Sequence, residues 1–180
     1  MKLDRTRTAL AVVDVQEAFR PAVLDFETVA RNVATLVQGA RILELPMLVT
    51  EQYPRGLGDT VPEVARHLEG IERMEKVCFS AVEADGFYAR LNAEERDQVL
   101  LCGIESHVCV NQTAEDLLAE GREVHVARDA VSSRSAANRE LGLHKMERAG
   151  AVVTSVETAL FELLRAAGTP EFKEIQNLVR

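Results

Sequence analysis

Tryptophan is absent from this 180-residue chain, and aromatic residues make up only 4% of it. Aromatic rings are the platforms on which single-stranded nucleic acids stack, so their scarcity argues against such a ligand. Positive charge is also in short supply, because 21 Lys and Arg stand against 29 Asp and Glu, for a net charge of -8. Without a run of cations to neutralise phosphates, we expect no nucleic-acid partner.

Long apolar runs and paired cysteines are missing as well. No apolar segment approaches the roughly 20 residues that cross a bilayer, so we expect no membrane partner. The start, MKLDRTRTALAVVDV, lacks the apolar core and cleavage site of a secretory signal. Three cysteines, Cys78, Cys102 and Cys109, are an odd number without CxxC spacing. We therefore expect reduced thiols and a cytoplasmic location.

What is present is an alternation of short apolar runs with segments of helical spacing, in one domain spanning residues 1–180. Runs without polar alternation are typical of parallel strands that are buried on both faces. Strands are expected at 8–13, 46–50, 75–81, 99–102, 123–127 and 151–154, and helices at 26–43, 87–91, 107–120, 136–149, 156–167 and from 170 onward. The pattern predicts an α/β fold, a single-domain doubly wound (Rossmann-like) six-stranded parallel sheet with helices on both faces. The turn-rich residues 54–62 are expected to form a loop over the site.

The stretch from Val99 to Thr113 carries the main chemical hypothesis. A strand meets Gly103 and a short turn, and the turn delivers Cys109 to the start of a helix. Free N–H groups and partial positive charge at a helix N-terminus lower a thiol pKa and can stabilise an oxyanion. Cys109 is therefore a candidate nucleophile with its thiolate favoured. Taken alone, the stretch equally fits a small cysteine packed in the core, which is the commoner case.

Two charged residues at other strand ends strengthen this hypothesis. Asp14 ends the first expected strand and Lys76 lies on the third. Open α/β sheets bind ligands at the carboxyl ends of their strands, near the point where the winding reverses. A thiol nucleophile needs a base and a cation, which Asp14 and Lys76 can supply if the sheet brings them to Cys109.

Three motifs resemble those of the isochorismatase-like cysteine hydrolase family. They are VVDVQEAF at 12–19, EKVCFSA at 75–81 and LCGIESHVCVNQTAEDLL at 101–118. The segment TEQYPRGLGDTVPEV at 50–64 is similar to the isochorismatase domain-containing subgroup, whose substrates are mostly unassigned. The likeness covers nearly the whole chain.

The resemblance implies roles for particular residues. Cys109 corresponds to the nucleophile, Asp14 to the general acid/base and Lys76 to their electrostatic partner. A cis peptide bond is implied between Ile104 and Glu105, which turns the amides of Glu105 and Cys109 toward one oxyanion. The implied reaction is hydrolysis of an amide or related C–N bond of a small molecule through a Cys109 acyl-enzyme. The alternative is a catalytically dormant scaffold or interaction protein that kept the fold.

Departures from the family pattern limit the substrate. Nicotinamidases of the family carry a metal-binding Asp-x-His, whereas this chain has Glu51-Gln52-Tyr53, so we predict no metal and no cofactor. True isochorismatases lack the nucleophilic cysteine, so Cys109 argues against that reaction. Candidate substrate-binding residues are Gln16, Phe19, Tyr53 and His107. The family also implies a homo-oligomer, for which the helix-rich segment 161–180 is the expected contact.

Overall fold

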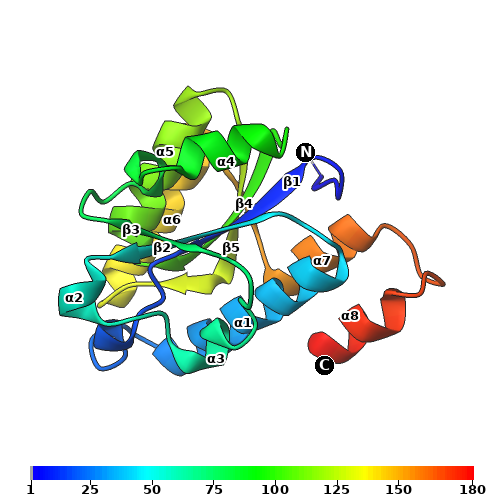
Figure 1. The fold of residues 1–180 in the computed structure, drawn as a ribbon, viewed down its shortest axis with the longest axis horizontal. Helices are drawn as coiled ribbons and strands as arrows, with labels where there is room; N and C mark the ends of the chain where they lie inside the picture. Colours follow the sequence, from blue (N-terminus) through cyan, green and yellow to red (C-terminus); the bar gives the residue numbers. More distant parts are fainter. Residues whose placement is uncertain (1) are drawn as a thin grey trace.

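A single parallel sheet forms the centre of the computed structural model, which describes residues 2–180 (Figure 1). Its strand order is β3-β2-β1-β4-β5-β6, so the winding reverses between β1 and β4. The strands are β1 (Thr8–Val13), β2 (Met47–Gln52), β3 (Arg73–Lys76), β4 (Gln98–Ile104), β5 (Glu123–Ser132) and β6 (Val152–Thr154). All pairings between them are parallel. The prediction of a six-stranded doubly wound sheet is confirmed.

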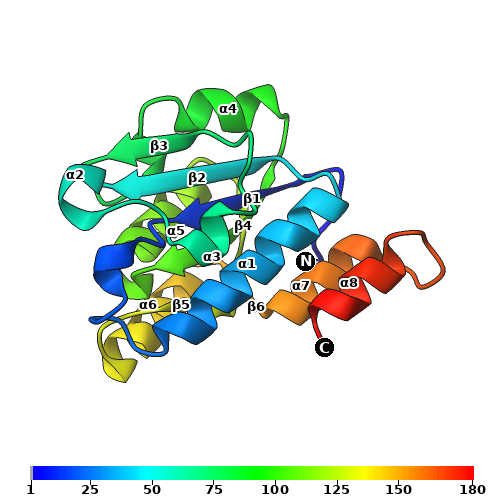
Figure 2. The same cartoon turned by 60° about the horizontal axis from the view of Figure 1, so that its bottom comes forward.

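Helices cover both faces of this sheet, as predicted (Figure 2). One face carries α1 (Phe26–Ile42), α3 (Pro62–Ala65), α7 (Val156–Leu164) and α8 (Phe172–Leu178). The other carries α4 (Phe87–Ala93), α5 (Asn111–Ala119) and α6 (Ala136–Ala149). Short elements fill the connections: α2 (Pro54–Leu57) and the turns η1 (Glu17–Phe19), η2 (Ala81–Glu83) and η3 (Ser106–Val110). None of the helices within residues 2–180 is both long and apolar enough to cross a membrane.

The apolar sequence of β1, TALAVV, is explained by burial on both faces. Leu10 and Val12 pack against the α1 face, while Ala9, Ala11 and Val13 pack against the α5 face. Successive strand residues point to opposite faces, so a strand covered on both sides needs apolar residues throughout.

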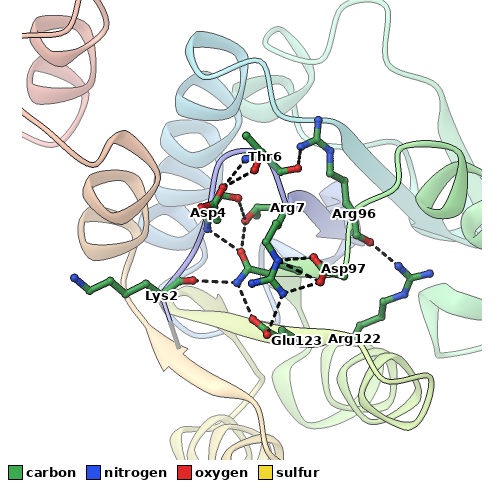
Figure 3. A network of polar contacts seen from close by, with 10 residues as sticks. Lys2, Asp4, Thr6, Arg7, Arg96, Asp97, Arg122 and Glu123 are labelled. Carbon is green, nitrogen blue, oxygen red and sulfur yellow. Dashed lines mark hydrogen bonds and ion pairs between the residues drawn. The ribbon is translucent and has the colours of Figure 1, made fainter.

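Polar contacts fix the amino ends of the strands (Figure 3). Gln98, at the start of β4, is buried; its carboxamide oxygen accepts from the Asp4 N–H at 2.7 Å. Its amide nitrogen donates to the Lys2 carbonyl at 3.0 Å and to Glu123 at 2.7 Å. Arg7 also pairs with Glu123, at 3.1 Å. These contacts tie β1, β4 and β5 together at the edge opposite their carboxyl ends.

Several expected boundaries were wrong. The strand expected at 123–127 continues as β5 to Ser132. The strand expected at 75–81 is β3, which ends at Lys76, because the chain then turns so that the carbonyls of Cys78 and Phe79 accept from the Lys76 ammonium. The helix expected from His107 begins instead as the π-helical turn η3, and regular α5 starts at Asn111. The loop expected over 54–62 contains the four-residue helix α2.

The C-terminal segment does not offer the apolar surface expected for self-association. Ile175 of α8 is fully buried, and Phe172, Leu178 and Val179 pack against the same core as α1. The apolar side of α8 is thus used within the chain.

Candidate active site

Asp14 lies directly after β1, where its left-handed backbone (φ 52°) turns the chain out of the strand. Its side chain is fully buried. One carboxylate oxygen accepts from the Thr50 hydroxyl at 2.8 Å, and the other accepts from the Lys76 ammonium at 2.6 Å. Both partners lie at the carboxyl ends of neighbouring strands, β2 and β3.

The Lys76 ammonium is surrounded by oxygen atoms. Besides Asp14 it donates to the Gln52 side-chain oxygen at 2.6 Å and to the Phe79 and Cys78 carbonyls at 3.0 and 3.2 Å. An ammonium has three N–H donors, so four acceptors leave none of them free. Lys76 is therefore held as a charge beside Asp14 and has no donor left for a ligand.

Gln52 is a residue of this cluster that the sequence reasoning missed. Its side-chain nitrogen donates to the Val77 carbonyl at 2.8 Å while its oxygen accepts from Lys76. The available signal was strand alternation, which places Gln52 on the same face of β2 as Thr50.

Gln16 holds Gln52 rather than lining a pocket. It is fully buried, and its carboxamide donates to the Gln52 and Gly58 carbonyls at 3.0 and 2.6 Å. Its oxygen accepts from the Gln52 N–H at 2.7 Å. Gln16 was expected to bind substrate, and in the structure this side chain has no exposed surface and its polar atoms are engaged within the chain.

Cys109 belongs to η3 and is only 6% exposed. The Asp14 carboxylate and the Glu105 backbone N–H both lie next to its thiol. Burial and the negative charge of Asp14 raise the pKa of Cys109 to about 12, against the opposing effect of Lys76. The expectation of a depressed thiol pKa was wrong, since burial beside a carboxylate outweighs the helix N-terminus. Cys109 therefore rests as a thiol.

The pKa of Asp14 is also shifted. Burial raises it, while the charge of Lys76 and the hydrogen bonds from Lys76 and Thr50 oppose the rise. A carboxylate with a raised pKa is a stronger proton acceptor, which suits a group that must take a proton from a thiol. Asp14 and Cys109 are therefore arranged as a base and the thiol that gives it a proton, and not as an ion pair with a preformed thiolate.

Glu105 begins the turn that carries Cys109, and the peptide bond between Ile104 and Glu105 is cis. Its side chain is 9% exposed, and one carboxylate oxygen accepts from both the backbone N–H and the Nε of Arg134, at 2.9 and 3.1 Å. This contact joins the end of β4 to the segment between β5 and α6.

The remaining expected binding residues are more exposed than the buried cluster. His107 is half-buried, and its Nδ1 lies 2.9 Å from the Ser133 hydroxyl. Phe19 is half-buried and packs against the α1-side core. Tyr53 is 54% exposed and, with Pro54, Arg55, Glu75, Lys76 and Val77, lines a hollow of about 310 Å³. This hollow therefore reaches Lys76 of the cluster.

No group of three or more His, Cys, Asp and Glu within residues 2–180 is arranged to hold a metal ion. Near the cluster, Glu51 points one carboxylate oxygen at the N–H and hydroxyl of Thr60, at 2.7 and 2.6 Å. Glu51 thus fixes the loop before α3.

Comparison with known proteins assigns the family, because residues 8–158 match the isochorismatase domain. This chain belongs to the isochorismatase family. A relative named secreted isochorismatase effector Isc1, from Phytophthora sojae, is 43% identical over 96% of this chain and 84% of its own length. Zebrafish (Danio rerio) isochorismatase domain-containing protein 2 is 41% identical over 99% of this chain and 89% of its own.

Solved structures of the isochorismatase family are similar in fold and sequence. One, titled MAR1 ribonuclease from Caenorhabditis elegans, has a TM-score of 0.94 and 40% identity, over 99% of this chain and 92% of its own. YcaC from Pseudomonas aeruginosa was determined with hexane-2,5-diol and covalent acrylamide. It has a TM-score of 0.91 and 26% identity, over 98% of this chain and 91% of its own. Family membership supports a hydrolase activity.

Proposed function

We propose that this protein is a metal-independent cysteine hydrolase that cleaves an amide or related C–N bond of a small molecule through a Cys109 acyl-enzyme. The observation that carries the proposal is the buried contact of the Cys109 thiol with Asp14, which itself accepts from Lys76 at 2.6 Å. The cluster contains a nucleophile, a base and a fixed positive charge, which are the groups that acyl transfer requires.

The first half of the reaction transfers the acyl group. As the sulfur attacks the carbonyl carbon, the thiol proton passes to Asp14, and the amides of Glu105 and Cys109 receive the oxyanion. The tetrahedral intermediate collapses when the C–N bond breaks and the leaving nitrogen takes the proton from Asp14. A thioester on Cys109 and a free amine are the products of this half.

Hydrolysis of the thioester completes the cycle. Asp14 accepts a proton from water as the oxygen attacks the thioester carbonyl, and the acid product leaves when the C–S bond breaks. The proton returns to the Cys109 sulfur, which restores the thiol. Lys76 keeps its contacts throughout and limits the rise in the pKa of Asp14, so that the carboxylate is available as the base.

The descriptions of two similar structures bear on the nucleophile and on the substrate. Covalent acrylamide in the P. aeruginosa protein is the behaviour of a protein with an accessible nucleophile, since acrylamide alkylates thiolates. The ribonuclease title of the C. elegans protein raises RNA as an alternative substrate. Against RNA stand the net charge of -8, the scarcity of aromatic residues and the thiol nucleophile, so we propose a small-molecule substrate.

The proposal is tested by acrylamide labelling followed by peptide mapping. Although Cys109 is 6% exposed and rests as a thiol, we expect it to be labelled ahead of the half-buried Cys78, because Asp14 accepts its proton as the sulfur attacks; Cys78 serves as the internal comparison. In Asp14→Asn we expect turnover on a panel of small amides to be lost, while the pKa of Cys109 falls because the adjacent negative charge is gone.

Labelling of Cys78 ahead of Cys109, together with no turnover on amides, would favour the dormant scaffold. Cleavage of RNA that survives Cys109→Ser would point to a different reaction at another site.

A further inference from the structure

We propose that Arg134 is a substrate-binding residue that selects small molecules carrying a carboxylate close to the scissile bond. The inference rests on the proposed function, because it concerns the substrate of the Cys109 site. Glu105 links Arg134 to Cys109, because its backbone N–H lies next to the Cys109 sulfur and its carboxylate accepts from Arg134.

The contact with Glu105 fixes Arg134 more firmly than an ordinary surface ion pair. The Glu105 carboxylate is 9% exposed, and one of its oxygens accepts from both the backbone and the side chain of Arg134. Exposed ion pairs add little stability, because forming one requires two mobile side chains to be ordered. Here the backbone N–H of Arg134 also donates to Glu105, so the backbone from which the side chain extends is held in place.

The same contact leaves the outer end of the guanidinium free. Arg134 uses its Nε toward Glu105, whereas its two terminal nitrogens have no hydrogen-bond partner within residues 2–180, and its side chain is 62% exposed. Two parallel N–H donors on a planar group match the two oxygens of a carboxylate. Arg134 therefore presents a carboxylate-binding fork beside the turn that carries Cys109.

Charge around the cluster favours this assignment. Lys76 has no donor left, because its ammonium already has four acceptors. Arg134, on the segment that follows β5 and next to the start of η3, still has free donors.

The test uses reagent pairs that differ only in charge. Iodoacetylglycine and iodoacetyl-β-alanine each carry a carboxylate, and each has a neutral carboxamide counterpart of the same length. In the parent protein, the ratio of the Cys109 alkylation rates, anionic over neutral, should exceed that in Arg134→Gln by tenfold or more for at least one spacer. Arg134→Lys, which keeps the charge but lacks the fork, should fall between them. Arg148→Gln, at the last turn of α6, is the matched control and should keep the parent ratio.

An unchanged ratio in Arg134→Gln, with the neutral reagents still reacting at Cys109, would overturn the role of Arg134 and leave the cysteine hydrolase intact. If Arg134→Gln slowed the alkylation of Cys109 equally by the anionic and the neutral reagent of each pair, Arg134 would serve only to hold Glu105 in place. This result would also overturn the proposal. Failure of every reagent to reach Cys109 would remove the nucleophile itself and both proposals with it.

Discussion

At the scale of single residues, the candidate site is organised by hydrogen bonds that hold charged groups in place. Gln52 accepts from Lys76 and donates to the Val77 carbonyl, while Gln16 holds its backbone on both sides. Neither glutamine needs to touch a substrate for its loss to disturb the ammonium beside Asp14.

Gln52→Met keeps the length of the side chain but removes both of its polar contacts. We expect kcat on a small-amide substrate to fall by tenfold or more with little change in KM, because Lys76 is no longer held in register with Asp14. The free energy of unfolding should fall by about 1–3 kcal/mol, the cost of a lost hydrogen bond to a charged group. Steady-state kinetics and urea denaturation measure these effects, with Gln176→Met on α8 as the control. A change in KM alone would contradict the positioning role.

The buried side chain of His125 on β5 makes the stability of the folded chain depend on pH. It is fully buried, and neither ring nitrogen has a partner within residues 2–180. Burial lowers its pKa from the ordinary 6.5, although Glu162 and Glu123 oppose the shift. Below pH 6.5 the unfolded chain therefore binds a proton that the folded chain refuses, and stability falls as the pH falls.

His125→Leu should remove this loss of stability. Each pH unit between the ordinary pKa and the lowered one costs the parent up to about 1.4 kcal/mol. Thermal denaturation at pH 7.5 and pH 5.5 should show a smaller drop in Tm for His125→Leu than for the parent. His144→Leu, at an exposed position on α6, should behave as the parent does. An equal drop in all three proteins would show that other groups set the acid limit.

At the scale of elements, the turn η3 that carries Cys109 is shaped by the close approach of α6. A side-chain carbon added at Gly142 would lie 2.5 Å from the backbone carbonyl of Ser106 and 2.7 Å from the His107 nitrogen. Backbone atoms cannot move aside as a flexible side chain can, so the absence of a side chain at Gly142 allows α6 to pack directly on η3.

Gly142→Ala should therefore displace η3 and the Cys109 sulfur. We expect turnover and Cys109 alkylation to fall by tenfold or more in protein that remains folded by circular dichroism. Gly39→Ala is a matched change, because its new methyl group would meet only the flexible side chain of Leu160 on the opposite face of the sheet. It should lower Tm yet keep the alkylation rate. Equal alkylation rates in the two variants would show that η3 tolerates the shift.

The elements also show what could be predicted from the sequence. Unbroken apolar runs such as TALAVV identified parallel strands, and the end of the first run placed Asp14 at the carboxyl edge of the sheet. The strand expected at 75–81 put Lys76 near its start, and it is the observed end of β3 at Lys76 that brings this residue to the same edge. The turn after Lys76 escaped prediction because Val77 to Phe79 read as apolar strand, whereas their conformation is set by backbone carbonyls that face an ammonium. The pattern of apolar and polar side chains in the sequence does not reveal such backbone contacts. The raised pKa of Cys109 could not be predicted for a similar reason, because it depends on how deeply the folded chain buries the thiol.

At the scale of the whole molecule, the C-terminal helix closes the core on the α1 face. Ile175 has no exposed surface. Ile175→Ala should lower the free energy of unfolding by about 2–5 kcal/mol, the usual cost of removing a buried aliphatic side chain. Leu141→Ala, at a position 53% exposed, should change it by less than about 1 kcal/mol. Urea denaturation compares the two; similar losses would mean that α8 is not part of the cooperative unit.

Assembly remains a prediction at this scale. With the apolar side of α8 engaged, the exposed large apolar side chains among residues 2–180 are Leu24, Tyr53, Val77, Phe79 and Leu141. A homo-oligomer should therefore use these positions, and Val77→Asp together with Phe79→Asp should lower the mass measured by light scattering. A monomeric parent would end the prediction.

The enclosure of Lys76 has a practical consequence for handling the protein. Its ammonium is buried and its N–H donors are all engaged, whereas amine-directed reagents need an exposed amine. Coupling to an activated resin, reductive methylation or fluorophore labelling should therefore consume Lys2, Lys145 and Lys173 and spare Lys76. The enzyme can be immobilised through its lysines with the charge beside Asp14 intact.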